Sequence, residues 1–138
     1  RKPNIRGAIA MGIFTDAETN LIRDHLFGGA TKGATNYDVV LCETITDENA
    51  GTITEVAGTG SGAKVAGTDF DWDRGTAEQA SNDAELRWTN GSGGNWTVEG
   101  YALKNGGTVV AVHTFASVRT VPNGTDIFFA IGGAVATL

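Results

Sequence analysis

The sequence predicts a mainly β protein, an antiparallel β-sandwich or barrel-like fold with one short N-terminal helix and an extended N-terminal arm. Apolar runs rich in Val, Thr and aromatic residues recur along the chain, and turn residues separate them. They amount to roughly seven to nine strands spaced about 8–12 residues apart, a pattern of sandwiches and not of alternating βαβ units. The 20 glycines supply turns, and a hydrophobic content of 41% in 138 residues is enough for one domain with a core.

The first element is the arm, residues 1–13, which is irregular and contains Pro3 and two glycines. Residues 14–138 are then predicted to form the single sandwich domain. The basic cluster of the chain lies in the arm and consists of Arg1, Lys2 and Arg6. This cluster is interpreted either as a solvated tail or as an arm that becomes ordered against the surface of a partner.

The second element is a helix, predicted at about residues 16–27. Thr15 and Glu18 have the spacing of a capping box, so each side chain can bind the backbone amide of the other. Gly28-Gly29 supplies a C-terminal stop. The apolar face of the helix is expected to contain Ala17, Leu21 and Leu26.

Short strands separated by turns are predicted for the rest of the chain. The predicted strands span residues 36–45, 52–57, 63–73, 83–89, 95–104, 108–116, 127–131 and 134–138. Asn105-Gly106-Gly107 between two of these runs is a strong hairpin signal. "VPNGTD" (121–126) is predicted to be a turn, and the glycine-rich "GTGSG" (58–62) is interpreted as a flexible connection.

An acidic alternation stands out in "GTDFDWDRG" (67–75). Its aspartates are Asp69, Asp71 and Asp73. A calcium-binding EF-hand loop that began at Asp69 would need glycine at its sixth position and glutamate at its twelfth, but Arg74 and Ala80 stand there. The better interpretation is a strand that points Phe70 and Trp72 into the core and the aspartates to water, where they discourage stray edge pairing. A looser surface cation site stays an alternative.

No other pattern predicts chemistry, so we expect no catalytic residue, no metal ligand and no cofactor. Cys42 lies in an apolar run and is predicted to be a small core residue, and a single cysteine excludes an intrachain disulfide. His25 and His113 have no recognisable nucleophile motif beside them. Acidic residues could in principle pair as in a glycosidase, but solvated strand faces explain them better.

The three tryptophans have two interpretations. Trp72, Trp88 and Trp96 lie in predicted strands or at their starts. Exposed rings would suit a carbohydrate-binding face, whereas the core interpretation is favoured because Trp72 shares its parity with Phe70, and Trp88 with Leu86.

The net charge and the length of the apolar runs exclude some classes of partner. The net charge of −6 argues against nucleic acid and against an anionic membrane surface as main partners. The longest uncharged apolar stretch, "IFFAIGGAVATL" at the C-terminus, is too short to span a bilayer as a helix.

Across about residues 18–138 the chain resembles small bacteriophage virion proteins, of the kind labelled head-decoration-like or tail-fibre-like. The resemblance is carried by "NLIRDHLFGG" before "YDVVLCET", and by "TEVAGTGSGAKVAG", "NWTVEGYALKNGGTVVAV" and "RTVPNGTDIFFAIGGAVATL". The chain departs from the family pattern at Ser61-Gly62, where Gly-Tyr is usual, at Lys64, where Arg is usual, and at Gly124-Thr125-Asp126, which spreads a Gly-Asp pair.

The resemblance implies a non-enzymatic structural protein of the virion, assembled in the host cytoplasm. It favours a capsid decoration (cement) protein that bridges and stabilises major capsid subunits, present as a homo-oligomer, with a trimer the favoured arrangement. A tail, fibre or baseplate component with a receptor-binding role and a carbohydrate-binding β-sandwich are the alternatives. The candidate partner contacts are Arg1, Lys2, Arg6, Asp69, Asp71 and Asp73.

Overall fold

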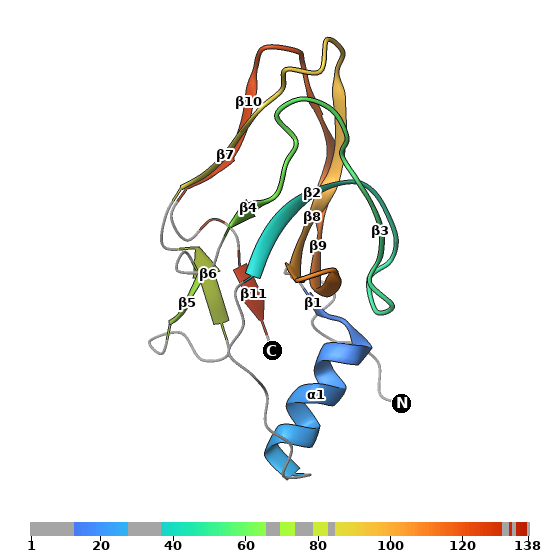
Figure 1. The fold of residues 1–138 in the computed structure, drawn as a ribbon, viewed down its shortest axis with the longest axis vertical. Helices are drawn as coiled ribbons and strands as arrows, with labels where there is room; N and C mark the ends of the chain where they lie inside the picture. The colour runs from blue at the N-terminus through green and yellow to red at the C-terminus, as the bar shows by residue number, and fades with distance from the viewer. Residues whose placement is uncertain are drawn as a thin grey trace.

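The computed structural model describes residues 13–27, 37–65, 70–73, 79–82, 85–130, 133 and 135–137. These residues form antiparallel sheets and one helix, which confirms the predicted mainly β, sandwich-like fold class, although the sheets are not closed into a barrel (Figure 1). The helix α1 spans Asp16–Phe27 and extends away from the sheets. The strands are β1 (Ile13–Phe14), β2 (Tyr37–Asp47), β3 (Thr52–Glu55), β4 (Lys64–Val65), β5 (Phe70–Asp73), β6 (Gln79–Asn82), β7 (Leu86–Thr89), β8 (Trp96–Asn105), β9 (Thr108–Val121), β10 (Asp126–Phe129) and β11 (Val135–Thr137).

The described strands form three sheets. The largest has the order β1-β9-β8-β2-β3, with β4 paired to β2, and the smaller two have the orders β10-β7 and β11-β6-β5. The β8–β9 hairpin closes at Asn105↔Thr108 around Gly106, whose φ is 61°, so the predicted Asn-Gly-Gly turn is confirmed.

Some predicted strand boundaries are wrong. Residues 63–73 do not form one strand, because β4 pairs in the large sheet and β5 in the three-stranded sheet. The strands β1 and β6 were not predicted, since two to four residues are too few to show a periodicity. Ile13, placed in the arm by the sequence, is the first residue of β1, which pairs with β9, and the other arm residues lie outside the described part of the chain.

The bounds of the helix are as predicted, but Ala17, which was expected on its apolar face, is exposed. The amide of Glu18 donates to Thr15 Oγ1 at 3.3 Å, as a cap requires. Thr15 is itself fixed to the sheet, because its amide donates to the Val110 carbonyl at 3.0 Å and its hydroxyl to the Val109 carbonyl at 3.1 Å. This anchoring sets the rotation of the first turn, so that Glu18 is buried and Ala17 is exposed. The side chains of Leu21 and Leu26 lie outside the description.

The first half of β2, in the middle of the large sheet, is buried on both faces. Val39 and Leu41 of β2 belong to the main core, which joins this sheet to the β7–β10 sheet. Val40 and Cys42, the alternate residues, belong to a second, smaller core on the opposite face. Register shifts within β2 allow its second half to curl with β3, and Ile53 of β3 packs against this second core. The sheet therefore has no fully solvated face over β2.

The "GTGSG" segment is held in place and is not the flexible connection that its composition predicted. Gly60 has a φ of 93°, and a Cβ there would lie 1.8 Å from the carbonyl oxygen of Thr89. The amide of Gly91 also donates to the Thr59 carbonyl at 2.9 Å, which ties this loop to the one that follows β7. Backbone packing therefore requires a glycine at position 60.

Gly60→Ala is expected to lower the free energy of unfolding by about 2–4 kcal/mol, because a left-handed backbone and a backbone collision act together. Gly62→Ala is the matched control in the same loop, since nothing lies within 4 Å of a Cβ at that position. The control should change stability by about 0.5 kcal/mol or less. Urea unfolding of both variants measures the difference, and equal losses would contradict the proposed collision.

Candidate interaction surface

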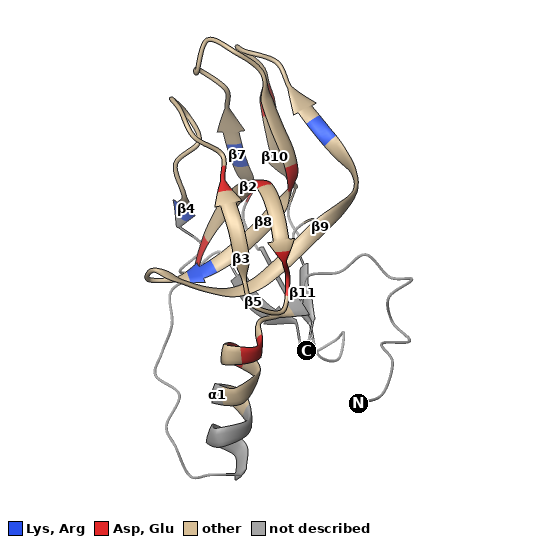
Figure 2. Cartoon of the chain, turned by 90° about the vertical axis from the view of Figure 1, so that its right-hand side faces the viewer, with Lys and Arg blue, Asp and Glu red and all other residues tan. Residues whose placement is uncertain are grey.

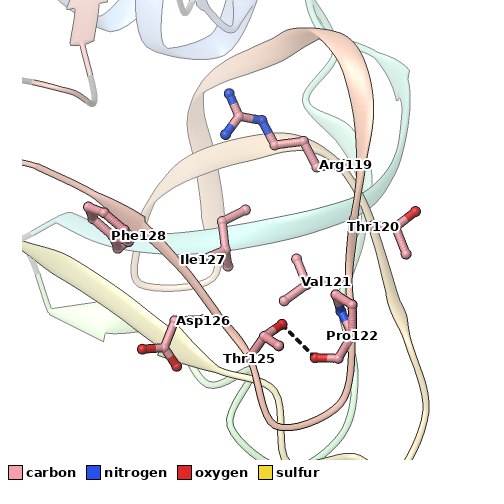
Figure 3. Close-up of a pocket in the computed structure, with 8 residues that line it drawn as sticks. All are labelled: Arg119, Thr120, Val121, Pro122, Thr125, Asp126, Ile127 and Phe128. Carbon is pink, nitrogen blue, oxygen red and sulfur yellow. Dashed lines mark hydrogen bonds between the residues drawn. The ribbon is translucent and has the colours of Figure 1, made fainter.

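A groove of about 360 Å³ lies where β9 ends and β10 begins, and residues 119–122 and 125–128 line it (Figure 3). The two strands follow each other in the chain across a short turn, yet they belong to different sheets. Val121 of β9 pairs with Trp96 of β8, and Phe128 of β10 pairs with Arg87 of β7. The groove is thus the open seam between the two sheets of the sandwich.

Asn90 joins the end of β9 to the start of β10. Its side-chain amide donates to the Val121 carbonyl at 2.8 Å, on the β9 side. Its backbone amide donates to the Thr125 carbonyl at 2.9 Å, and its own carbonyl accepts from the Gly124 amide at 2.7 Å, on the β10 side. Asn90 is completely buried. Its backbone bonds continue the pairing of β7 with β10, and its side chain ties the end of β9 to that pair.

The turn itself is fixed by local bonds. The amide of Thr125 donates to the Pro122 carbonyl at 3.1 Å, and its hydroxyl donates to the same oxygen at 2.7 Å (Figure 3). Gly124 has a φ of 78°, as the third residue of such a turn can require. The turn predicted in "VPNGTD" is confirmed, and it gives the groove a rigid end.

Of the charged side chains that line the groove, one is paired with an opposite charge and one is not. Arg87 donates to Asp126 at 2.7 Å and to Glu85 at 2.8 Å, and its guanidinium lies 4.4 Å from the centre of the Phe128 ring. The hydrogen bond from the Thr89 side chain, followed by the one from Arg87, lowers the pKa of Asp126, which is therefore ionised and already paired. Arg119 lies 4.7 Å from the centre of the Phe115 ring and has no carboxylate partner within the described part of the chain.

The strand β9 bows outward beside the groove. Its register jumps from Gly100↔Thr114 to Val98↔Arg119, so residues 115–118 lie opposite the single residue Glu99. Figure 2 shows the resulting curve of β9. The bulge leaves the side chain of Val118 56% exposed, and on β10 the side chain of Phe128 is 48% exposed.

The residues that the sequence selected as partner contacts are not brought to this groove. Asp71 and Asp73 lie in β5, opposite Ser81 and Gln79 of β6, at one end of the three-stranded sheet. Their side chains, and the residues Arg1, Lys2, Arg6 and Asp69, lie outside the described part of the chain. The strand assignment for residues 70–73 is confirmed, whereas the outward direction of the aspartates stays a prediction.

Sequence reasoning missed the groove, although one signal was present. "IFF" (127–129) places three apolar residues in succession in a predicted strand. Because strand side chains alternate, Phe128 must face away from Ile127 and Phe129, which are buried. An exposed phenylalanine on β10 could therefore have been deduced, but not the strand that lies across the groove from it.

The tryptophans and His113, which the sequence left as candidates for binding or chemistry, are buried or half-buried where the structure describes their side chains. Trp88 is 0% and Trp96 is 4% exposed, which confirms the core interpretation for both, while the Trp72 side chain lies outside the description. His113 is half-buried and stacks on Tyr101 at 5.0 Å between ring centres. Among the described residues, no group of three or more His, Cys, Asp or Glu could hold a metal ion, and no helix there is long and apolar enough to cross a membrane.

Cys42 is buried, as predicted, and burial together with Glu55 and Glu99 raises the pKa of its thiol from 9.0 to about 12. Below pH 9 the thiol is neutral in both the folded and the unfolded chain, so it adds no pH dependence. Above pH 9 only the unfolded chain releases the proton, and stability falls until about pH 12. Between pH 8 and 10.5 the protein should lose about 2 kcal/mol more than its Cys42→Ala variant. Urea unfolding of both proteins at pH 8 and pH 10.5 measures this difference. Equal losses in the two proteins would contradict the raised pKa of Cys42.

The fold and the groove define a sandwich-like β protein with one partly apolar, structurally fixed candidate binding surface. Neither the protein-family models nor the curated proteins compared with this chain match it.

Proposed function

We propose that the protein is a non-enzymatic structural component of a bacteriophage virion, most specifically a capsid decoration (cement) protein that bridges and stabilises major capsid subunits. The observation that carries the proposal is the seam between β9 and β10, where the half-exposed Phe128 borders a groove of about 360 Å³. Aromatic side chains beside a polar rim are typical of surfaces that bind another protein. The resemblance to small virion proteins supplies the class of partner.

The rigidity of the seam supports a role in permanent contact. Asn90 and the 122–125 turn fix both walls of the groove through hydrogen bonds. A surface that is already ordered loses little conformational entropy on binding, so more of its contact energy stabilises the assembly. A cement protein needs this property, because it must add stability at many equivalent positions of a shell.

Particles stripped of the protein and reloaded with purified protein test the proposal. Particles reloaded with the wild type should withstand a higher temperature than stripped particles, and Phe128→Asp should reload poorly. Thr97→Asp, at an exposed position of β8, is the control for an added surface charge. Equal heat resistance of stripped and intact particles would refute the cementing role.

Copy number separates decoration from a place in the tail. A decoration protein is present in hundreds of copies per particle, whereas a tail, fibre or baseplate component is present in few. The proposal extends to a homo-oligomer, with a trimer as the favoured state at local symmetry axes of the shell. Sedimentation of the purified protein measures the oligomeric state, and a strict monomer on and off the particle would exclude the trimer.

A further inference from the structure

We propose that the groove binds an extended, carboxylate-bearing segment of a partner protein by adding it as a strand to the open edge of β10. This inference rests on the proposed function, because it names how the virion partner would be held. Within the described chain β10 pairs on one side only, with β7, and β9 pairs beyond residue 113 only with β8. Two strand edges therefore face the same groove without ladder partners there.

The two edges are not paired with each other within the described residues. Asn90 is bonded to the Val121 carbonyl on one side and to Gly124 and Thr125 on the other. Pro122 provides no amide hydrogen at the start of the turn. A polypeptide that enters as a strand can supply the missing backbone hydrogen bonds, as in other complexes that form by strand addition.

The charge of the groove selects the chemistry of that strand. Asp126, the one carboxylate among the residues that line the groove, is already bound by Arg87, which also pairs with Glu85. The guanidinium of Arg119 is positioned by the Phe115 ring, lies under the arch of β9 in Figure 3, and has no carboxylate partner in the described residues. Arginine forms strong, directional bonds with carboxylates. The segment should thus carry an acidic residue facing β9 and apolar residues beside Phe128.

Binding of short capped peptides tests the proposed strand addition in solution. The acidic probe is acetyl-Val-Glu-Val-Glu-Val-amide, the basic probe has lysine in place of glutamate, and a third probe is the acidic peptide with N-methylated amides. Chemical-shift titration of the whole chain should show binding of the acidic probe, at least tenfold weaker binding of the basic probe, and no binding of the N-methylated one. Shifts should centre on residues 119–121 and 126–128.

Variants of the protein complete the test. Arg119→Glu should weaken binding of the acidic probe at least tenfold and strengthen binding of the basic probe. Lys64→Glu, the same charge change on β4, should leave the binding of both probes unchanged. Equal binding of both probes to the wild type, or binding of the N-methylated peptide, would overturn the inference. Self-association that Arg119→Glu abolishes would assign the groove to a second copy and also overturn it. Peptide binding without any gain in particle heat resistance would instead refute the proposed function alone.

Discussion

Trp88→Ala is expected to lower the free energy of unfolding by about 3–5 kcal/mol, the largest effect of any single substitution considered for this chain. Trp88 is fully buried at the centre of the main core, where its ring meets Phe129 edge-on at 5.8 Å. Its indole N–H also donates to the Gly62 carbonyl at 3.0 Å. The substitution removes apolar contacts between two sheets and leaves a cavity that the strands around it cannot fill. Urea unfolding followed by far-ultraviolet circular dichroism measures the loss.

Two phenylalanine variants separate the hydrogen bond from the packing. Trp88→Phe leaves the Gly62 carbonyl without its indole donor, so it should lose about 1–2 kcal/mol more than size alone explains. Trp96→Phe is the matched variant, because Trp96 is buried and its indole nitrogen has no hydrogen-bond partner in the described residues. It should cost less than Trp88→Phe. The reverse order would mean that the Trp88 bond does not contribute.

Asn90→Ala is expected to cost about 2–4 kcal/mol, an effect that is large for a residue outside the strands. The Asn90 side chain donates to Gly94 and Val121, and its Oδ1 accepts from the amide and the hydroxyl of Ser92. Removing the amide leaves the buried Val121 carbonyl without this donor and breaks the part-buried bonds to Gly94 and Ser92. Because the same side chain ties the end of β9 to the loop that follows β7, the variant should also broaden the amide resonances of residues 119–128.

Asn123→Ala is the control for this prediction. Asn123 joins the same loops through one exposed bond, from the Gly93 amide to its Oδ1 at 2.9 Å, so the loss should stay below about 1 kcal/mol. Asn90→Asp should not rescue the alanine variant at neutral pH, since a carboxylate would face the carbonyl oxygens of Gly94 and Val121. An aspartate variant as stable as the wild type would contradict the role assigned to the amide donors.

The sequence predicted the core position of Trp88, whereas it showed the type of Asn90 but not its role. Asn90 stood in "NGSGG", a composition that indicates a loop and nothing more. Its role in joining the end of β9 to the start of β10 depends on contacts with Val121 and Thr125, more than thirty residues away. Sequence pattern reports local preference, and these contacts are long-range.

The sequence by itself determined the elements that short-range physics controls. The capping residue Thr15 set the start of α1 and Gly106 set the β8–β9 turn. Alternation identified Trp88 as a core residue, and its apolar run identified Cys42 as one. Each of these depends only on neighbours within a few residues, or on the tendency of apolar side chains to leave water.

Only the tertiary structure decided which strands became partners and which surfaces stayed open. It divided the predicted strand 63–73 between two sheets, buried Glu18 while Ala17 stayed exposed, and placed β9 and β10 in different sheets. The physical reason is that backbone hydrogen-bonding groups are the same in every residue, so the sequence does not encode strand pairing directly. Pairing is selected by the packing of the whole core, and the groove at the seam is a consequence of that packing.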